Sequence, residues 1–202
     1  MLFLPIRGPR LAERLVRLVV GLLLFGAGSG LMLQSDLGLS PWDVLHQGLA
    51  IQLGLTVGAW TVIVAFVVLL LWLPLRERYG LGTLLNALII GPAIDMTTAI
   101  VPQPDALPAR AMLMVVGVVI VAIATGLYIG AHFGPGPRDG LMTGISKRGP
   151  SIRLTRAVIE LTVLVLGWML GGTVGVGTVV FAVAIGPLVQ VFLPIFEVDL
   201  QD

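Results

Sequence analysis

The distribution of apolar residues constrains this chain more than any other feature. Long apolar segments follow one another, each close to the ~20 residues that a helix needs to cross the hydrocarbon core of a bilayer. Because a backbone in lipid must satisfy its hydrogen bonds within its own helix, these segments predict an all-α, polytopic membrane protein. They cover residues 14–35, 57–75, 81–101, 111–131, 153–170 and 175–194.

The composition agrees with this class and excludes several others. Hydrophobic residues make up 57% of the chain and charged residues only 11%, whereas soluble domains carry about 25% charged residues. There is no cysteine, which excludes disulfides, thiolate metal sites and cysteine nucleophiles. Basic residues cluster beside apolar segments, a pattern typical of cytoplasmic loops and not of nucleic-acid binding.

Two shorter runs, residues 41–53 and 137–148, lie between the long segments. At ~1.5 Å per residue, neither can span the ~30 Å hydrocarbon core. The second run follows a break at residues 134–140, where prolines and glycines alternate and two charges follow. Irregular backbone persists at membrane depth only when it is buried in protein or lines a wet cavity. We therefore expect this break to be functionally important.

The sequence also contains an internal duplication. Residues 96 positions apart match through the first part of each half, and residues 95 apart match through the last part. The matches that apolar composition explains least are Pro41 with Pro137, Asp43 with Asp139, Trp72 with Trp168, Gly80 with Gly175, and Gly91-Pro92 with Gly186-Pro187.

Each repeat is predicted to hold three spanning helices and a short re-entrant half-helix that follows a hairpin broken by glycine and proline. If the short helices re-enter, the halves are inverted about an axis in the membrane plane, and if they cross, the halves are parallel. Inverted halves place Arg76 and Arg78 in the cytoplasm and Arg110 outside, which suits the positive-inside rule slightly better. The shortness of the two runs is the stronger argument for re-entry and so for inversion. We thus expect inverted repeats at residues 14–101 and 111–194, with a cytoplasmic basic segment 1–13, an extracytoplasmic linker 102–110 and a tail 195–202.

The starts of the two short helices form the predicted site. Ser40 is at the N-cap position with Asp43 three residues later, and Gly136 with Asp139 repeats the arrangement. Helix N-termini expose unpaired N–H groups and the positive end of the helix dipole. Two of them meeting near the midplane would bind a negative or electronegative group. The alternative is that Asp43 and Asp139 only cap their helices.

Arg138 is the strongest candidate for solute contact, because an always-charged side chain at membrane depth must face a cavity, a carboxylate or an anion. A purely structural pair with Asp139, Asp95 or Glu160, or snorkelling to the interface, are the alternatives. Trp42 occupies the position that matches Arg138 in the other repeat. It can stack on a ligand, offer a cation–π face or anchor the chain at the interface.

Further polar residues are predicted within the long segments. Asp95 and its counterpart Gln190 each follow a Gly-Pro pair, so both are expected beside a kink, lining a pathway or joining helices by hydrogen bonds. Glu160 lies four residues after Arg156, which predicts an ion pair on one helix face near the interface, with a proton relay as the alternative.

His46 and His132 are candidates for proton coupling, with packed or interfacial histidines as the alternative. His46 shares a helix face with Asp43, but no third ligand stands at chelating spacing. No metal site and no cofactor are predicted. No nucleophile motif, phosphate-binding loop or dinucleotide fingerprint is present, so an enzyme is not predicted either.

The chain resembles the YczE/YyaS/YitT-type bacterial integral membrane proteins over nearly its whole length. The residues that carry the resemblance are Asp36-Leu37-Gly38-Leu39-Ser40-Pro41-Trp42-Asp43-Val44-Leu45-His46, Gly80-Leu81-Gly82-Thr83, Asn86, Ile90-Gly91 and Asp95. The resemblance implies a bacterial membrane protein, and it supplies no substrate or catalytic residue.

These observations predict a multi-pass protein of the bacterial cytoplasmic membrane with both chain ends in the cytoplasm. Its expected function is transport or channelling of a small polar or anionic solute, bound where the two short helices begin. The alternatives are an accessory protein that binds another membrane protein, and a scramblase-like lipid pathway. The expected partners are the bilayer, the solute and a second copy of the chain in a homodimer, with no nucleic acid.

Overall fold

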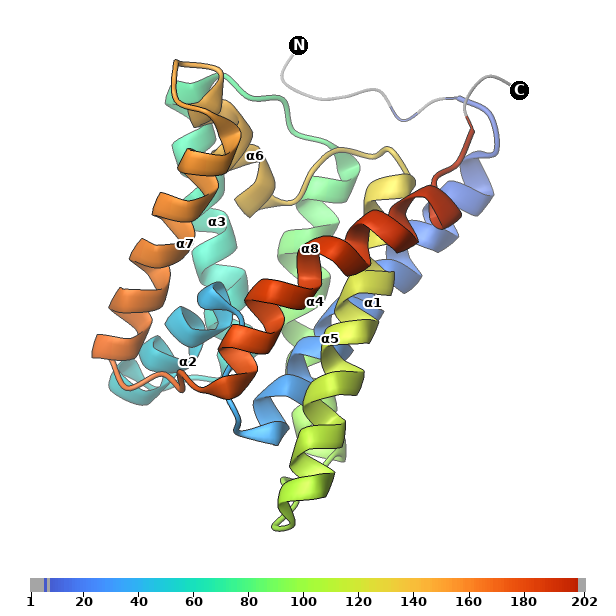
Figure 1. Cartoon of the computed structure of the whole chain (residues 1–202). Helices are drawn as coiled ribbons and strands as arrows, with labels where there is room; N and C mark the ends of the chain where they lie inside the picture. The colour runs from blue at the N-terminus through green and yellow to red at the C-terminus, as the bar shows by residue number, and fades with distance from the viewer. Residues whose placement is uncertain (1–5, 7, 200–202) are drawn as a thin grey trace.

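The computed structural model describes residues 6 and 8–199, so Arg7 and the ends of the predicted basic segment and tail lie outside it. The described part is all-helical (Figure 1), without a β-sheet. Its eight helices are α1 (Leu11–Ser35), α2 (Pro41–Leu53), α3 (Val57–Leu75), α4 (Leu81–Ile100), α5 (Leu107–Gly130), α6 (Pro137–Ser146), α7 (Ile152–Met169) and α8 (Val176–Phe196).

Five of these helices are long and apolar enough to cross a membrane, one fewer than the sequence predicts. They are α1, α3, α4, α5 and α8. The predicted span that is not among them is α7. It has only 18 residues and carries three charges in its first half, at Arg153, Arg156 and Glu160. Length and apolar character therefore support five candidate spans in the described residues, and the passage of α7 through the bilayer is a proposal.

Helix ends follow the predicted signals closely. α2 has the predicted bounds, because the Ser40 hydroxyl accepts a hydrogen bond from the Asp43 N–H at 3.3 Å and Gly54 ends the helix. α5 begins earlier than expected, at Leu107. Pro108 occupies its first turn, where the missing proline N–H leaves no hydrogen bond unmade.

Successive long helices run in opposite directions between two faces of the molecule (Figure 1). On one face, the Arg14 guanidinium donates to the carbonyls of Ala131 and His132 at 2.9 and 3.1 Å, so the start of α1 lies beside the end of α5. On the other face, Arg110 near the start of α5 donates to the Ser35 carbonyl at 2.8 Å. α1 and α5 are therefore antiparallel neighbours.

The two hairpins before the short helices are held in a reciprocal way. The Gly82 N–H in α4 donates to the Phe133 carbonyl at 2.9 Å, in the hairpin before α6. The Gly177 N–H in α8 donates to the Leu37 carbonyl at 2.7 Å, in the hairpin before α2. Each hairpin thus rests on the first turn of a long helix from the other half of the chain.

Each hairpin turns at a glycine with positive φ, Gly38 at 119° and Gly134 at 101°, a conformation that other residues rarely adopt. After these turns α2 and α6 begin inside the bundle and run outward to opposite faces (Figure 1). α2 packs on α7, and α6 packs on α3. The interior starts of the two short helices face the same region of the bundle.

The helix pair α3–α4 is packed, whereas α7 and α8 diverge (Figure 1). Between α3 and α4, a methyl group on Gly91 would collide with the Gly58 carbonyl. A methyl group on Gly186, which lies 95 residues after Gly91, would meet nothing within 4 Å. The bundle is therefore closed on the side of α3–α4 and open on the side of α7–α8.

Candidate functional site

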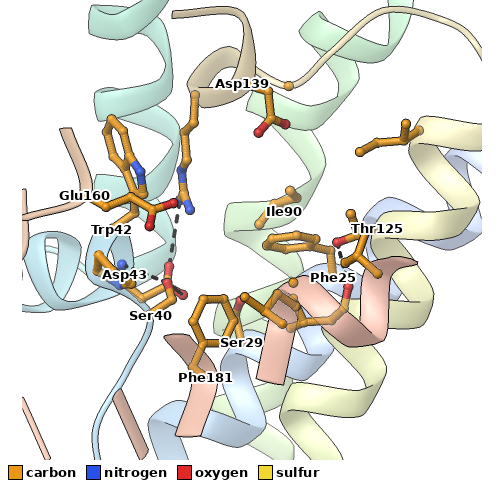
Figure 2. Close-up of a pocket in the computed structure, with 18 of the residues that line it drawn as sticks. Phe25, Ser29, Ser40, Trp42, Asp43, Ile90, Thr125, Asp139, Glu160 and Phe181 are labelled. Carbon is orange, nitrogen blue, oxygen red and sulfur yellow. Dashed lines mark hydrogen bonds and ion pairs between the residues drawn. The ribbon is translucent and has the colours of Figure 1, made fainter. Parts of the chain in front are cut away.

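A cavity of about 330 Å³ lies where α2 and α6 begin. Figure 2 shows Ser40, Trp42 and Asp43 on one side of it, with Phe25 and Thr125 facing them. Helices from both halves of the chain form its wall. Its polar lining residues are Ser29, Ser40, Trp42, Asp43, Asn86, Thr125, Tyr128, Arg138, Asp139, Arg156, Glu160 and Gln190, and Phe25, Ile90, Val121, Ile129, Phe181, Ile185 and Val189 contribute apolar surface.

The start of α2 presents a buried carboxylate. Asp43 is only 4% exposed, and its Oδ2 accepts a hydrogen bond from the Ser40 hydroxyl at 2.6 Å. The predicted capping box would instead have the carboxylate accept from the Ser40 backbone N–H. Ser40 caps the helix and Asp43 binds the hydroxyl of that cap, which leaves the second carboxylate oxygen, Oδ1, directed elsewhere.

The start of α6 has no side-chain cap, because Gly136 occupies the N-cap position. Its place is fixed by Trp72 in α3, whose indole N–H donates to the Pro137 carbonyl at 3.0 Å. Asp139, in the first turn, accepts a hydrogen bond from the Tyr128 hydroxyl at 2.9 Å through Oδ2. Asp139 is therefore tied to α5, and the first-turn N–H groups of α6 have no capping side chain.

Arg138 connects the two short helices. Its Nη2 lies 3.8 Å from Asp43 Oδ1, and its guanidinium carbon lies 5.1 Å from the centre of the Trp42 ring, within cation–π range. Within the described part of the chain, the carboxylate within 4 Å of Arg138 is that of Asp43 and not of Asp139, Asp95 or Glu160, the three expected from the sequence. At 3.8 Å this ion pair is longer than a hydrogen bond.

Several buried polar atoms of α2 have no hydrogen-bonding partner in the described residues. They are the indole N–H of Trp42, Asp43 Oδ1 and His46 Nε2. The His46 Nδ1 lies 3.4 Å from Asp43 Oδ1 and 3.0 Å from the Thr61 hydroxyl. His46 therefore contacts Asp43 without itself lining the cavity. Buried polar groups are nearly always paired. Trp42 and Asp43 line the cavity, and each has one buried polar atom without a hydrogen bond in the described residues.

The structure gathers most of the predicted site residues at this cavity. Those that line it are Ser40, Trp42, Asp43, Gly136, Arg138, Asp139 and Gln190. His46 is 1% exposed and lies behind Asp43, away from the lining. His132 lies at the molecular surface, where its Nε2 is 3.5 Å from Glu197.

Asp95 also lies away from the cavity. Its carboxylate accepts hydrogen bonds from the Thr56 hydroxyl at 2.6 Å and from the Gly58 N–H at 2.9 Å. It therefore binds the first turn of α3. Gln190, which was expected to mirror Asp95, faces the cavity instead, so the two matched positions have different surroundings.

The predicted pair of Arg156 and Glu160 is confirmed, with 2.8 Å between Arg156 Nε and Glu160 Oε1. Both residues line the main cavity and a second one of about 210 Å³ between α7 and α8. Every residue that lines the second cavity except Ala182 also lines the first, so the two cavities adjoin. The pair therefore lies on the open side of the site.

Sequence reasoning missed three hydroxyl groups of the lining, those of Ser29, Thr125 and Tyr128. Ser29 and Thr125 are 96 positions apart. A search for polar residues at matched positions of the duplication would have found both. Tyr128 matches the apolar Met32, so this search would have missed it. In the described residues, no group of three His, Asp or Glu side chains is placed to hold a metal ion.

Comparison with known proteins gives relatives without an assigned activity. A relative from Haemophilus influenzae, described as an uncharacterized protein, is 45% identical over 88% of this chain and 82% of its own length. The uncharacterized membrane protein YczE of Bacillus subtilis is 36% identical over 86% of this chain and 82% of its own.

The uncharacterized protein YyaS of Bacillus subtilis is 32% identical over 88% of this chain and 91% of its own length. No solved structure matches the chain. A family model described as a family of unknown function, DUF6198, matches residues 12–194. The resemblance stated from the motifs is thereby confirmed, and the chain belongs to this YczE- and YyaS-like family of bacterial membrane proteins.

Proposed function

We propose that the protein is a membrane transporter or channel for a small polar or anionic solute, which binds in the cavity between the starts of α2 and α6. The observation that carries the proposal is the lining of this cavity, which brings together Trp42, Asp43 and Arg138 from the starts of both short helices. Two fully buried atoms next to it, Trp42 Nε1 and Asp43 Oδ1, have no hydrogen-bond partner in the described residues, which costs about 1–3 kcal/mol for each such group. A shift of these side chains on solute binding would bring both atoms to partners on the solute or its water.

The proposed architecture is a pair of inverted repeats, each with a re-entrant short helix. The opposite directions of α1 and α5, and the reciprocal hairpin bonds of Gly82 and Gly177, support it. In many secondary transporters, interrupted helices from two inverted repeats hold the solute near the midplane. α2 and α6 would have this role here, with α7 as the sixth spanning helix.

The proposed mechanism is alternating access. α3 and α4 are packed together while α7 and α8 are apart, so the matched helix pairs adopt two different arrangements. In an inverted-repeat transporter, one half moves against the other around a fixed site. The second state would bring α8 onto α7 and separate α4 from α3.

The proposed orientation places the start of α1 and the loop between α6 and α7 on the cytoplasmic side of the inner membrane. The face that holds Arg14 is rich in basic residues, which suits the positive-inside rule. Cysteines replacing Arg76 and Arg110 must then be labelled from opposite sides, with position 76 cytoplasmic. Labelling of position 76 from outside would reject the inverted arrangement.

A scramblase-like lipid pathway is the second candidate, favoured by the separation of α7 from α8. The second cavity lies between these two helices, with Phe181 and Ile185 on one wall and the Arg156–Glu160 pair on the other. A lipid headgroup would meet charge there while its chains stay in the bilayer. Flipping of a fluorescent lipid in vesicles that contain the purified protein would favour this candidate over solute transport.

The solute proposal is tested by single cysteines in membrane vesicles, because the natural chain has none. Ser40→Cys, Asp43→Cys, Gly136→Cys and Asp139→Cys should include positions that react with a membrane-impermeant thiol reagent. Leu70→Cys is the matched control, since residue 70 is 64% exposed on α3 but would face lipid. If all four cavity cysteines stay unreactive from both sides, the cavity is not an aqueous pathway and the proposal fails.

A further inference from the structure

The lining of the cavity points to a chemical class of solute. We propose that it is a small zwitterion, with a carboxylate and a protonated amine a few atoms apart and a short apolar substituent. This inference rests on the proposed function, because it takes the cavity as the solute site. The cavity wall holds hydrogen-bond donors and an acceptor close together, and their positions indicate which charges the solute carries.

One part of the wall offers hydrogen-bond donors without acceptors. The Trp42 indole N–H is buried and has no hydrogen-bond partner among the residues that the structure describes. Arg138, whose side chain is 24% exposed, makes one ion pair at 3.8 Å and one cation–π contact, neither of them a hydrogen bond. The start of α6 adds N–H groups that no side chain caps. Guanidinium and helix-start N–H groups together form a carboxylate-binding arrangement.

An acceptor lies directly beside these donors. Asp43 Oδ1 is fully buried and has no hydrogen bond within the described residues, although its neighbour Oδ2 is bonded to the Ser40 hydroxyl. An ammonium group has three donors and no acceptor, so it suits this oxygen once a shift of the Asp43 side chain turns it toward the cavity. Because Asp43 Oδ1 is only 3.8 Å from Arg138 Nη2, a ligand that uses both must carry its two charges close together.

The charges of the lining argue against a simple anion and against a simple cation. Arg156 and Glu160 neutralise each other at 2.8 Å, which leaves Arg138, Asp43 and Asp139 as the other charged residues of the lining. An anion on Arg138 would be close to the Asp43 carboxylate, and a cation on Asp43 would be close to the guanidinium. Like charges in a poorly solvated site repel strongly. A zwitterion places an opposite charge on each.

The remaining wall suits a short apolar substituent. Phe25 and Ile90 face Trp42 and Asp43 across the cavity (Figure 2). The volume of about 330 Å³ is at the low end of the ~300–1,000 Å³ typical of small-molecule sites. A solute with a few apolar carbons fits this space, and burial of those carbons would add to its affinity.

The test uses three probes that share one apolar body, with purified protein in detergent and the melting temperature as readout. L-Leucine carries both charges, 4-methylpentanoate lacks the amine, and 3-methylbutylamine lacks the carboxylate. We expect saturable stabilisation by L-leucine and at least about tenfold weaker binding of the other two, because each loses a charge-assisted hydrogen bond. Equal binding of either single-charge probe, or no binding of L-leucine, overturns the zwitterion proposal.

Two variants separate ligand contact from a structural role. Arg138→Gln should weaken L-leucine binding at least about tenfold, while Arg138→Lys, which keeps the charge, should bind more tightly than Arg138→Gln. A purely structural role would change the melting temperature of the free protein and leave the Kd for L-leucine unchanged, which would contradict the proposal.

Cysteine labelling and L-leucine binding together distinguish failure of the zwitterion proposal from failure of the proposed function. If cavity cysteines react with the aqueous thiol reagent but L-leucine does not bind, the zwitterion assignment is wrong and the solute pathway stands. If the cavity cysteines are unreactive from both sides, both ideas fail together. Binding of L-leucine that Arg138→Gln leaves unchanged would place the ligand elsewhere on the protein.

Discussion

The helix pairs α3–α4 and α7–α8, which the proposed duplication relates to each other, are packed differently. Gly91 in α4 touches the backbone of Gly58 in α3, and Asp95 binds the first turn of α3. The matching Gly186 faces no neighbour, and Gln190 lines the cavity. The contacts that close the first pair are thus absent from the second. The two helix pairs on either side of the cavity are therefore packed differently.

Two tryptophans show the same contrast. Trp72 on α3 is 1% exposed, stacks on Tyr79 with ring centres 5.5 Å apart and binds the start of α6. Trp168, at the matching position of α7, is 64% exposed. One copy holds a short helix in place, while the other has no comparable role in this arrangement. Paired substitutions at the matched positions can therefore test how far the two halves differ.

The largest effect is expected at the tryptophan pair. Trp72→Ala should destabilise the protein by about 3–5 kcal/mol, because it empties a buried site and removes the hydrogen bond to the Pro137 carbonyl. Trp168→Ala should change stability by about 0.5 kcal/mol or less. Melting temperatures in detergent measure both. Equal losses would mean that Trp168 is as buried as Trp72 in the protein as purified.

An intermediate effect is expected at the glycine pair. A side chain at Gly91 meets the Gly58 carbonyl, so Gly91→Ala should cost about 1–3 kcal/mol by overpacking. Gly186→Ala should be neutral or stabilising by up to about 1 kcal/mol, through better helix propensity. The same melting assay compares them. A loss at Gly186→Ala as large as at Gly91→Ala would indicate that α7 and α8 are packed most of the time.

The smallest effect is expected at Asp95 and Gln190. Asp95→Ala removes the partner of the Gly58 N–H and of the Thr56 hydroxyl, and should cost about 1–2 kcal/mol, as loss of a helix cap does. Gln190→Ala should stay within about 0.5 kcal/mol. Hydrogen exchange at the first turn of α3 gives a local readout. Unchanged protection there in Asp95→Ala would show that the cap contributes nothing.

Local sequence signals predicted most of the helices. Ser40, Pro41 and Gly54 give the ends of α2, because capping and helix termination depend on neighbouring residues. The break before α6 was predicted for the same reason. The sequence predicted six spans, whereas five helices of the described residues are long and apolar enough to cross a membrane. α7 is long enough for a short span, but its 18 residues include three charged ones.

Contacts between distant residues were the part that sequence could not supply. Arg138 and Asp43 are paired across the two halves, a contact that no periodicity predicts. The duplication suggested that Asp95 and Gln190 would share surroundings, yet one binds α3 and the other faces the cavity. Matched residues share surroundings only when their helices pack alike, and α3–α4 and α7–α8 do not.

The central claim is that these helix pairs are equivalent units that exchange between packed and separated arrangements around the cavity. Pulsed electron paramagnetic resonance on the protein in lipid vesicles tests it most directly, with spin labels at Val158 and Val183 for α7–α8 and at Leu70 and Leu88 for α3–α4. All four positions are exposed. We predict two distances for the α7–α8 pair, one long as in this structure and one shorter, with shares that shift when solute is added. A single long distance under every condition would contradict the claim.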